Sequence, residues 1–122
     1  MIIVIAGGRD YKLTPEGLCW LNAFNNQLHI QGVVSGGAPG ADAEGERWAH
    51  QQGIPVRVFK ADWVRWGTSA GPMRNQEMAN FLLLYPQRAV LLFPGGRGTA
   101  SMRKIAVNAG IPVYEFPNKL PS

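Results

Sequence analysis

Five short apolar runs recur along the chain, at residues 2–6, 32–35, 55–59, 88–93 and 112–116. Each run is continuous rather than alternating, which is typical of a parallel strand that is buried on both faces. The segments between the runs have helical length, and their apolar spacing predicts helices that end near residues 28, 52, 84 and 109. This alternation of strands and helices predicts a single α/β domain at residues 1–122, with a doubly wound, mostly parallel five-stranded sheet and helices on both faces.

The predicted helix boundaries rest on residues with known positional preferences. Thr14 is expected to cap the first helix, with Pro15 in its first turn. The second helix is expected over residues 41–52, the third over 70–84 and the fourth over 99–109. Residues 60–71 are the least regular part of the chain and contain Trp63 and Trp66. These rings either pack on the core from a short helix or form the wall of a ligand pocket or subunit contact.

The composition narrows the protein class. Apolar residues make up 46% of the chain and charged residues 16%, which is typical of a folded globular protein and not of a disordered one. No apolar stretch approaches the roughly 20 residues of a membrane helix, and no basic segment precedes the first apolar run, so we expect neither a membrane span nor a signal peptide. The single cysteine, Cys19, excludes an intramolecular disulfide and fits a reducing cytoplasm. With His29 and His50 it lacks zinc-ligand spacing, so no metal and no cofactor are expected.

The charge pattern favours a small anionic ligand. The formal net charge is +4, and eight of the twelve basic residues are arginines. They are scattered along the chain, whereas a nucleic-acid binder tends to cluster its basic residues in one run or on one helix face. The pattern therefore favours a compact anion over a polyanion, although a basic patch that contacts nucleic acid stays an alternative.

Three glycine-rich turns each follow an apolar run and lead toward a helix. They are Gly7-Gly8-Arg9-Asp10, Gly36-Gly37-Ala38-Pro39-Gly40-Ala41-Asp42 and Pro94-Gly95-Gly96-Arg97-Gly98-Thr99. Backbone N–H groups at such a turn, beside the positive end of a helix, hold phosphate or another anion. Since the carboxyl ends of parallel strands meet at one edge of the sheet, the turns are expected to surround one crevice. The candidate ligand-binding residues are Gly7, Gly8, Arg9, Asp10, Ser35, Gly36, Gly37, Gly40, Asp42, Pro94, Gly95, Gly96, Arg97, Gly98 and Thr99.

Asp42 has two interpretations. It stands at the start of the second predicted helix, where a carboxylate often caps the helix. The same carboxylate beside a glycine-rich turn is also suited to bind the hydroxyl groups of a ribose. No Ser-His-Asp or Cys-His arrangement can be assembled from the other residues.

Together with Gly71-Pro72-Met73-Arg74-Asn75, these turns resemble the YspA-like, cpYpsA-related branch of the SLOG superfamily, over essentially the whole chain. The superfamily includes the Lonely Guy enzymes, which hydrolyse the N-glycosidic bond of nucleoside 5′-monophosphates. The resemblance implies a Rossmann-like fold, a nucleotide-type ligand and a homodimer or higher homo-oligomer. It adds Arg74 and Asn75 to the candidate ligand-binding residues.

The chain departs from the Lonely Guy pattern at two positions. Met102 stands where the catalytic glutamate belongs, and Asn75 replaces a lysine. Since a thioether cannot take a proton, hydrolysis would need Arg74 together with a relocated carboxylate, for which the candidates are Asp42, Glu77, Asp10 and Asp62. The leading hypothesis is therefore binding of a nucleotide or an ADP-ribose-like derivative, for sensing or sequestration. The alternatives are a rearranged nucleotide N-glycosidase and a nucleic-acid-binding accessory protein.

Overall fold

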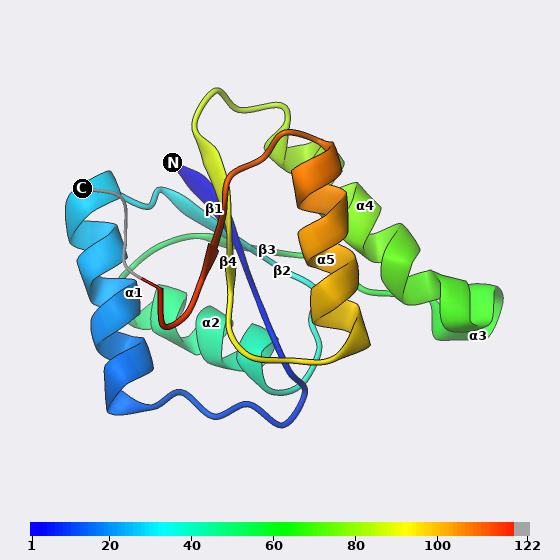
Figure 1. Ribbon diagram of the computed structural model, residues 1–122, viewed down its shortest axis with the longest axis horizontal. Coiled ribbons are helices and arrows are strands. Elements are labelled where there is room, and N and C mark those ends of the chain that lie inside the picture. The colour runs from blue at the N-terminus through cyan, green and yellow to red at the C-terminus, as the bar shows by residue number, and fades with distance from the viewer. Residues whose placement is uncertain (119–122) are drawn as a thin grey trace.

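A computed structural model of the protein describes residues 1–118, so the last four residues of the predicted domain lie outside the described chain (Figure 1). Five parallel strands form one sheet in the order β3-β2-β1-β4-β5. The strands are β1 (Ile2–Ala6), β2 (Gly32–Ser35), β3 (Val56–Val58), β4 (Arg88–Leu92) and β5 (Val113–Glu115). The predicted doubly wound α/β fold is confirmed, and the sheet is wholly parallel over the described strands.

Helices cover both faces of the sheet, as predicted. They are α1 (Pro15–Leu28), α2 (Ala41–Gln51), α3 (Trp63–Trp66), α4 (Ala70–Leu82) and α5 (Arg97–Asn108), with a 3₁₀ turn η1 (Gly67–Ser69) between α3 and α4. In Figure 1, α1 and α2 lie on one side of the strands and α4 and α5 on the other, while α3 extends beyond the end of α4. Across residues 1–118, none of these helices is long and apolar enough to cross a membrane.

Two hydrophobic cores, one on each face of the sheet, explain why the central strands have continuous apolar sequences. Ile3 and Ile5 of β1 belong to the core under α1 and α2, whereas Val4 belongs to the core under α4 and α5. The first core includes the buried rings of Trp20, Phe24 and Trp48. The second includes Met78, Leu82 and Met102. Since successive side chains of a strand point to opposite faces, a strand between two cores needs apolar residues at every position.

The two edge strands differ from this expectation. Val58 of β3 is exposed and its neighbour Val56 is only partly buried, and all three residues of β5 are partly buried. Each edge strand has one neighbouring strand, and the packed helices cover mainly the middle of the sheet. The prediction that every run is buried on both faces is therefore wrong for β3 and β5.

The start of α1 agrees with the sequence prediction, whereas the start of α5 and the end of α4 differ from it. Thr14 caps α1 as predicted, because its Oγ1 accepts a hydrogen bond of 3.0 Å from the backbone N–H of Gly17. The last helix begins at Arg97, two residues before the predicted Thr99. Gly96 is consequently its N-cap residue, and the glycine-rich turn itself supplies the first turn of α5. The helix α4 ends at Leu82 rather than at residue 84.

The segment after β3 forms the short helix α3, but its aromatic rings are not part of the core. Trp63 and Trp66 are each 46% exposed. The physical reason lies in the topology: β3 is an edge strand, and the chain that leaves it extends past α4 instead of crossing the covered middle of the sheet. The interpretation of both rings as core residues is wrong.

Candidate functional site

The three glycine-rich loops meet at the carboxyl edge of the sheet. They follow β2, β1 and β4, which are neighbours in the strand order. From β1 the chain winds outward to β2 and β3 on one side and to β4 and β5 on the other, so the loops surround the point where the winding reverses. Ligands of open α/β sheets bind at such a point. Backbone hydrogen bonds connect the loops, since Gly8 donates its N–H to Pro94 O at 2.8 Å and accepts from Ala41 N at 3.0 Å.

Gly40 allows the first and second loops to cross closely. Its φ of +78° is in the region that disfavours residues with side chains. A Cβ atom at this position would lie 2.2 Å from Gly8 O and 2.4 Å from Arg9 O. The glycine therefore brings the start of α2 against the loop that carries Arg9.

A cavity of about 610 Å³ opens among these loops and the first turns of α4 and α5. Its volume is within the range of small-molecule sites, roughly 300–1,000 Å³. The predicted ligand-binding residues that line it are Gly7, Gly8, Arg9, Asp42, Arg74, Asn75, Gly96, Arg97, Gly98 and Thr99. The structure thus gathers residues from all three loops and from α4 around one space.

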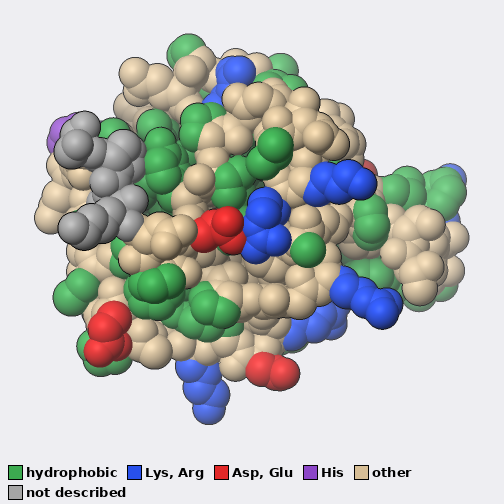
Figure 2. Space-filling model, in the orientation of Figure 1, with side chains coloured by type: hydrophobic (Ala, Val, Ile, Leu, Met, Phe, Trp, Pro, Cys, Tyr) green, Lys and Arg blue, Asp and Glu red, His purple; other side chains and the backbone are tan. Residues whose placement is uncertain are grey.

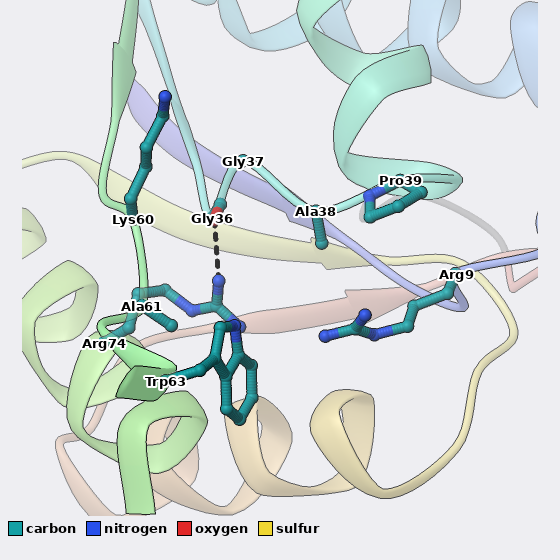
Figure 3. A pocket seen from close by; sticks show the side chains of 9 residues that line it. All are labelled: Arg9, Gly36, Gly37, Ala38, Pro39, Lys60, Ala61, Trp63 and Arg74. Atoms are coloured by element: carbon teal, nitrogen blue, oxygen red, sulfur yellow. Dashed lines mark hydrogen bonds between the residues drawn. The ribbon is translucent and has the colours of Figure 1, made fainter. Parts of the chain in front are cut away.

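A smaller lobe of about 270 Å³ adjoins the main cavity (Figure 3). Arg9, Ala38, Trp63 and Arg74 line both spaces. The predicted residues Gly36 and Gly37 line only the smaller lobe, together with Lys60. In Figure 3, the side chains of Arg9 and Arg74 extend toward each other below the loop that carries Gly36 and Gly37, whereas the Lys60 ammonium points away from them.

Arg74 is held in place by the second loop and by its own helix. Its Nη1 donates to Gly36 O at 2.6 Å, and its Nε donates to Asn75 Oδ1 at 3.0 Å. A Cβ atom on Gly36 would lie 2.5 Å from Arg74 Nη1, so glycine leaves the room that the guanidinium occupies. Burial lowers the pKa of Arg74, while the charge of Asp42 opposes that effect.

Asn75 connects α4 to α5. This buried amide donates from Nδ2 to Gly98 O and to Ser101 Oγ, each at 3.3 Å, while its Oδ1 accepts from Arg74. Its two ends therefore orient Arg74 and the first turn of α5 at the same time. Asn75 thus positions both groups that flank the cavity.

Asp42 lies in the wall of the main cavity and is 6% exposed. It does not cap α2, because Gly40 is the N-cap residue and no side chain makes the capping bond. Its Oδ2 accepts a 3.2 Å hydrogen bond from Ala38 N. Burial raises the pKa of Asp42 to about 6, against the opposing effects of that N–H group and of Arg74. The capping interpretation is wrong, and the carboxyl group faces the space where a ligand would lie.

Thr99 places an unpartnered hydroxyl at the N-terminus of α5. The residue is 4% exposed and lines the main cavity. Within residues 1–118, its Oγ1 has no hydrogen-bond partner, and no side chain caps α5. A buried hydroxyl without a partner is costly, and so are unpaired N–H groups at a helix start. An anionic oxygen in the cavity would satisfy both.

Trp63 forms part of the cavity wall, in agreement with the second interpretation of this ring. It lines both spaces, and the guanidinium carbon of Arg9 lies 5.6 Å from its ring centroid. A Cβ atom on Gly71 would approach the ring to 3.1 Å, so Gly71 gives the indole its room. Thr68 and Ser101 also line the main cavity, although nothing in the sequence marks them as candidates. Lys60 could have been selected from the sequence, because it directly follows the third predicted strand.

Several predicted ligand-binding residues line neither space. Ser35 is buried, donates its hydroxyl to Glu46 Oε2 at 2.6 Å and accepts from Gly37 N. It therefore shapes the second loop from behind. The others are Asp10, Gly40, Pro94 and Gly95.

The candidate catalytic residues are also separated by the fold. Glu77 is exposed on α4 and does not line either space, and Asp62 caps α3 by accepting from Arg65 N at 3.1 Å. Met102 is 1% exposed and lines the main cavity. Asp42 is the one carboxyl among the described residues that line the two spaces. Residues 1–118 hold no cluster of three or more His, Cys, Asp or Glu side chains placed to bind a metal.

Comparison with known proteins gives two findings. The family described as the YspA, cpYpsA-related SLOG family matches residues 1–66, which include the first two glycine-rich loops and Trp63. The Gene 61 protein of Mycobacterium phage D29 is 37% identical over 128 aligned residues, which cover 96% of this chain and 97% of the phage protein. This second similarity extends over the part of the chain that contains α4 and α5.

Proposed function

The chain belongs to the YspA, cpYpsA-related SLOG family, and we propose that it binds a nucleotide or a nucleotide derivative in the main cavity. Binding rather than turnover is the function, which suits a protein that senses or sequesters its ligand. The observation that carries the proposal is the buried, unpartnered Thr99 hydroxyl at the start of a twelve-residue helix that opens into this cavity.

The phosphate of the ligand is placed on the first turn of α5. The backbone N–H groups after Gly96 and the Thr99 hydroxyl are donors, and the Arg97 guanidinium adds positive charge beside them. The helix dipole favours an anion at the same place. Hydrogen bonds to a charged group contribute about 1.5–3 kcal/mol each. Two or three of them together contribute about 3–9 kcal/mol, and contacts to the base add to this free energy of binding.

The remaining groups of the cavity suit the rest of a nucleotide. The half-exposed ring of Trp63 offers a face on which a base can stack. Asp42 and Arg74 stand between the loops, where a carboxylate and a guanidinium can bind ribose hydroxyls or a phosphate oxygen. The family resemblance supports the same class of ligand.

The chemistry of Met102 argues for binding without hydrolysis. Breaking an N-glycosidic bond builds positive charge on the ribose, which a nearby carboxylate stabilises while it orients the attacking water. The corresponding side chain here is a thioether inside the cavity. Loss of one positioned acid–base group costs about 10²–10⁴-fold in rate.

A second candidate function is hydrolysis with Asp42 as the relocated carboxylate. The observation that favours it is that Asp42 lines the cavity, with a pKa raised by burial to about 6. A group that titrates near neutrality suits acid–base chemistry. Chromatography of free base after overnight incubation with AMP separates the two functions. Binding alone predicts little or no adenine, whereas multiple turnovers abolished by both Asp42→Asn and Arg74→Ala would establish the hydrolase.

The binding proposal is tested by calorimetry with AMP, ADP and ADP-ribose, using the variants Gly98→Val and Thr99→Val. A Cβ atom on Gly98 meets nothing within 4 Å, so the valine fits the free protein and extends toward the ligand space. Ala100→Val is the matched control, because it places the same side chain on an exposed residue of α5 that lines neither space. We expect at least a tenfold loss of affinity in Gly98→Val and Thr99→Val and an unchanged value in the control.

Two results would contradict this proposal. One is the absence of binding to the wild-type protein for all three nucleotides. The other is a nucleotide affinity that Gly98→Val and Thr99→Val leave at the wild-type value. Thermal unfolding of each variant without ligand checks that the fold is retained.

A further inference from the structure

We propose that the smaller lobe is a second anion subsite, so that the ligand carries phosphate groups on both sides of a nucleoside unit. This inference rests on the proposed function, because it takes the first phosphate to lie on α5. It names the class of ligand: a nucleoside bisphosphate, or a dinucleotide with a terminal phosphate, rather than a mononucleotide.

The charge of the lobe is the first argument. Three of its nine lining residues are cationic, namely Arg9, Lys60 and Arg74, and none of the nine is acidic. Asp42 lines only the main cavity. A hollow lined by several cations and by no carboxyl favours an anion over a neutral group.

The donors of the lobe are side chains rather than backbone. The N–H groups of Gly37 and Ala38 are already used, by Ser35 Oγ and Asp42 Oδ2. Arg74 lines the lobe and is fixed there by hydrogen bonds to Gly36 O and Asn75 Oδ1. Arg9 follows β1 and Arg74 belongs to α4, and their guanidinium groups extend toward each other in Figure 3, so an anion between them would be held from two directions. Lys60 adds a third positive charge at the edge of the lobe.

The position of Trp63 is the second argument. Its ring and the Arg9 side chain line both spaces, so the lobe and the main cavity are adjacent and the indole lies at their border. A base stacked on Trp63 would then have α5 on one side and the cationic lobe on the other. A ligand with one phosphate group, or with two adjacent ones, occupies only one of these ends.

The test compares adenosine 3′,5′-bisphosphate with AMP and ADP by calorimetry on the full chain. The bisphosphate has phosphates on opposite sides of the ribose, whereas ADP carries two in a row. We expect the bisphosphate to bind at least tenfold more tightly than AMP and more tightly than ADP.

Lys60→Ala is the informative variant, because Lys60 lines the lobe and not the main cavity. Lys104→Ala is the matched control, since this exposed lysine of α5 lines neither space and its loss changes the net charge equally. We expect Lys60→Ala to weaken the bisphosphate about three- to tenfold, as for a partly solvated charge pair, and to leave AMP unchanged. Lys104→Ala should leave both affinities unchanged.

The outcomes separate this inference from the proposed function. If AMP binds and Gly98→Val weakens it, but the bisphosphate binds no more tightly, the second subsite is refuted and the proposed function stands. The subsite is also refuted if Lys60→Ala and Lys104→Ala weaken the bisphosphate equally, since that marks a general charge effect. If AMP, ADP, ADP-ribose and the bisphosphate all fail to bind, both proposals fail.

Discussion

Asp42→Asn is expected to stabilise the ligand-free protein at neutral pH. The carboxyl is 6% exposed, and burial raises its pKa from 3.8 to about 6. A tenfold change in proton affinity corresponds to about 1.4 kcal/mol, so keeping this carboxylate ionised above pH 6 costs at most about 3 kcal/mol of folding free energy. Asparagine removes that charge and still offers an oxygen to the N–H of Ala38.

The sign of the pH dependence follows from the direction of the shift. Because the pKa is higher in the folded state, folding takes up a proton between pH 3.8 and 6. The stabilising contribution of the protonated carboxyl is fully present below pH 3.8 and is lost as the pH rises through 6. The asparagine variant does not titrate at this position, so its advantage over the wild type should grow across the same window.

The expected gain is about 1–3 kcal/mol at pH 7.5. The upper limit of about 3 kcal/mol already contains the favourable interaction between Asp42 and the Arg74 guanidinium, because that charge opposes burial in setting the pKa of Asp42. Urea unfolding of both proteins at pH 4, 6 and 7.5 measures it, and the difference should nearly vanish at pH 4. An asparagine variant that is less stable at pH 7.5, or a difference that does not change with pH, would refute the reasoning.

Two further predictions concern packing and assembly. Gly45→Ala should lower the free energy of unfolding by about 1–3 kcal/mol, because a Cβ atom would lie 2.7 Å from Ile5 Cγ2 in the core. Urea unfolding measures this loss. A stability equal to that of the wild type would show that α2 can shift freely. We also expect a homodimer that forms through the exposed side chains of Val64, Trp66 and Met73 on and near α3. Light scattering measures the mass, and Val64→Asp should weaken the dimer. A clean monomer at high micromolar concentration would exclude it. Figure 2 shows hydrophobic side chains gathered on the protruding end of the molecule that contains α3.

The fold was predictable because its signals are local. A strand between two helical layers needs apolar residues on both faces, as β1 has with Ile3, Val4 and Ile5. Thr14 caps α1 through a bond to a residue three positions away, so the motif is complete within one turn. The exposure of β3 and β5 could not be predicted from the sequence, because it depends on which strands lie at the edges of the sheet.

For the candidate site, too, some features follow from the sequence and others follow only from the tertiary structure. The amino-acid sequence by itself determined that three glycine-rich loops meet, because parallel strands bring their carboxyl ends to one edge. Only the tertiary structure decided which side chains face the crevice. Ser35 donates its hydroxyl to Glu46 and so lies behind the loop. Asp42 lines the cavity and accepts from Ala38 N instead of capping its helix. Trp63 forms part of the cavity wall because its segment passes beyond α4. These orientations arise from contacts between residues far apart in the chain, and local spacing carries no information about such contacts.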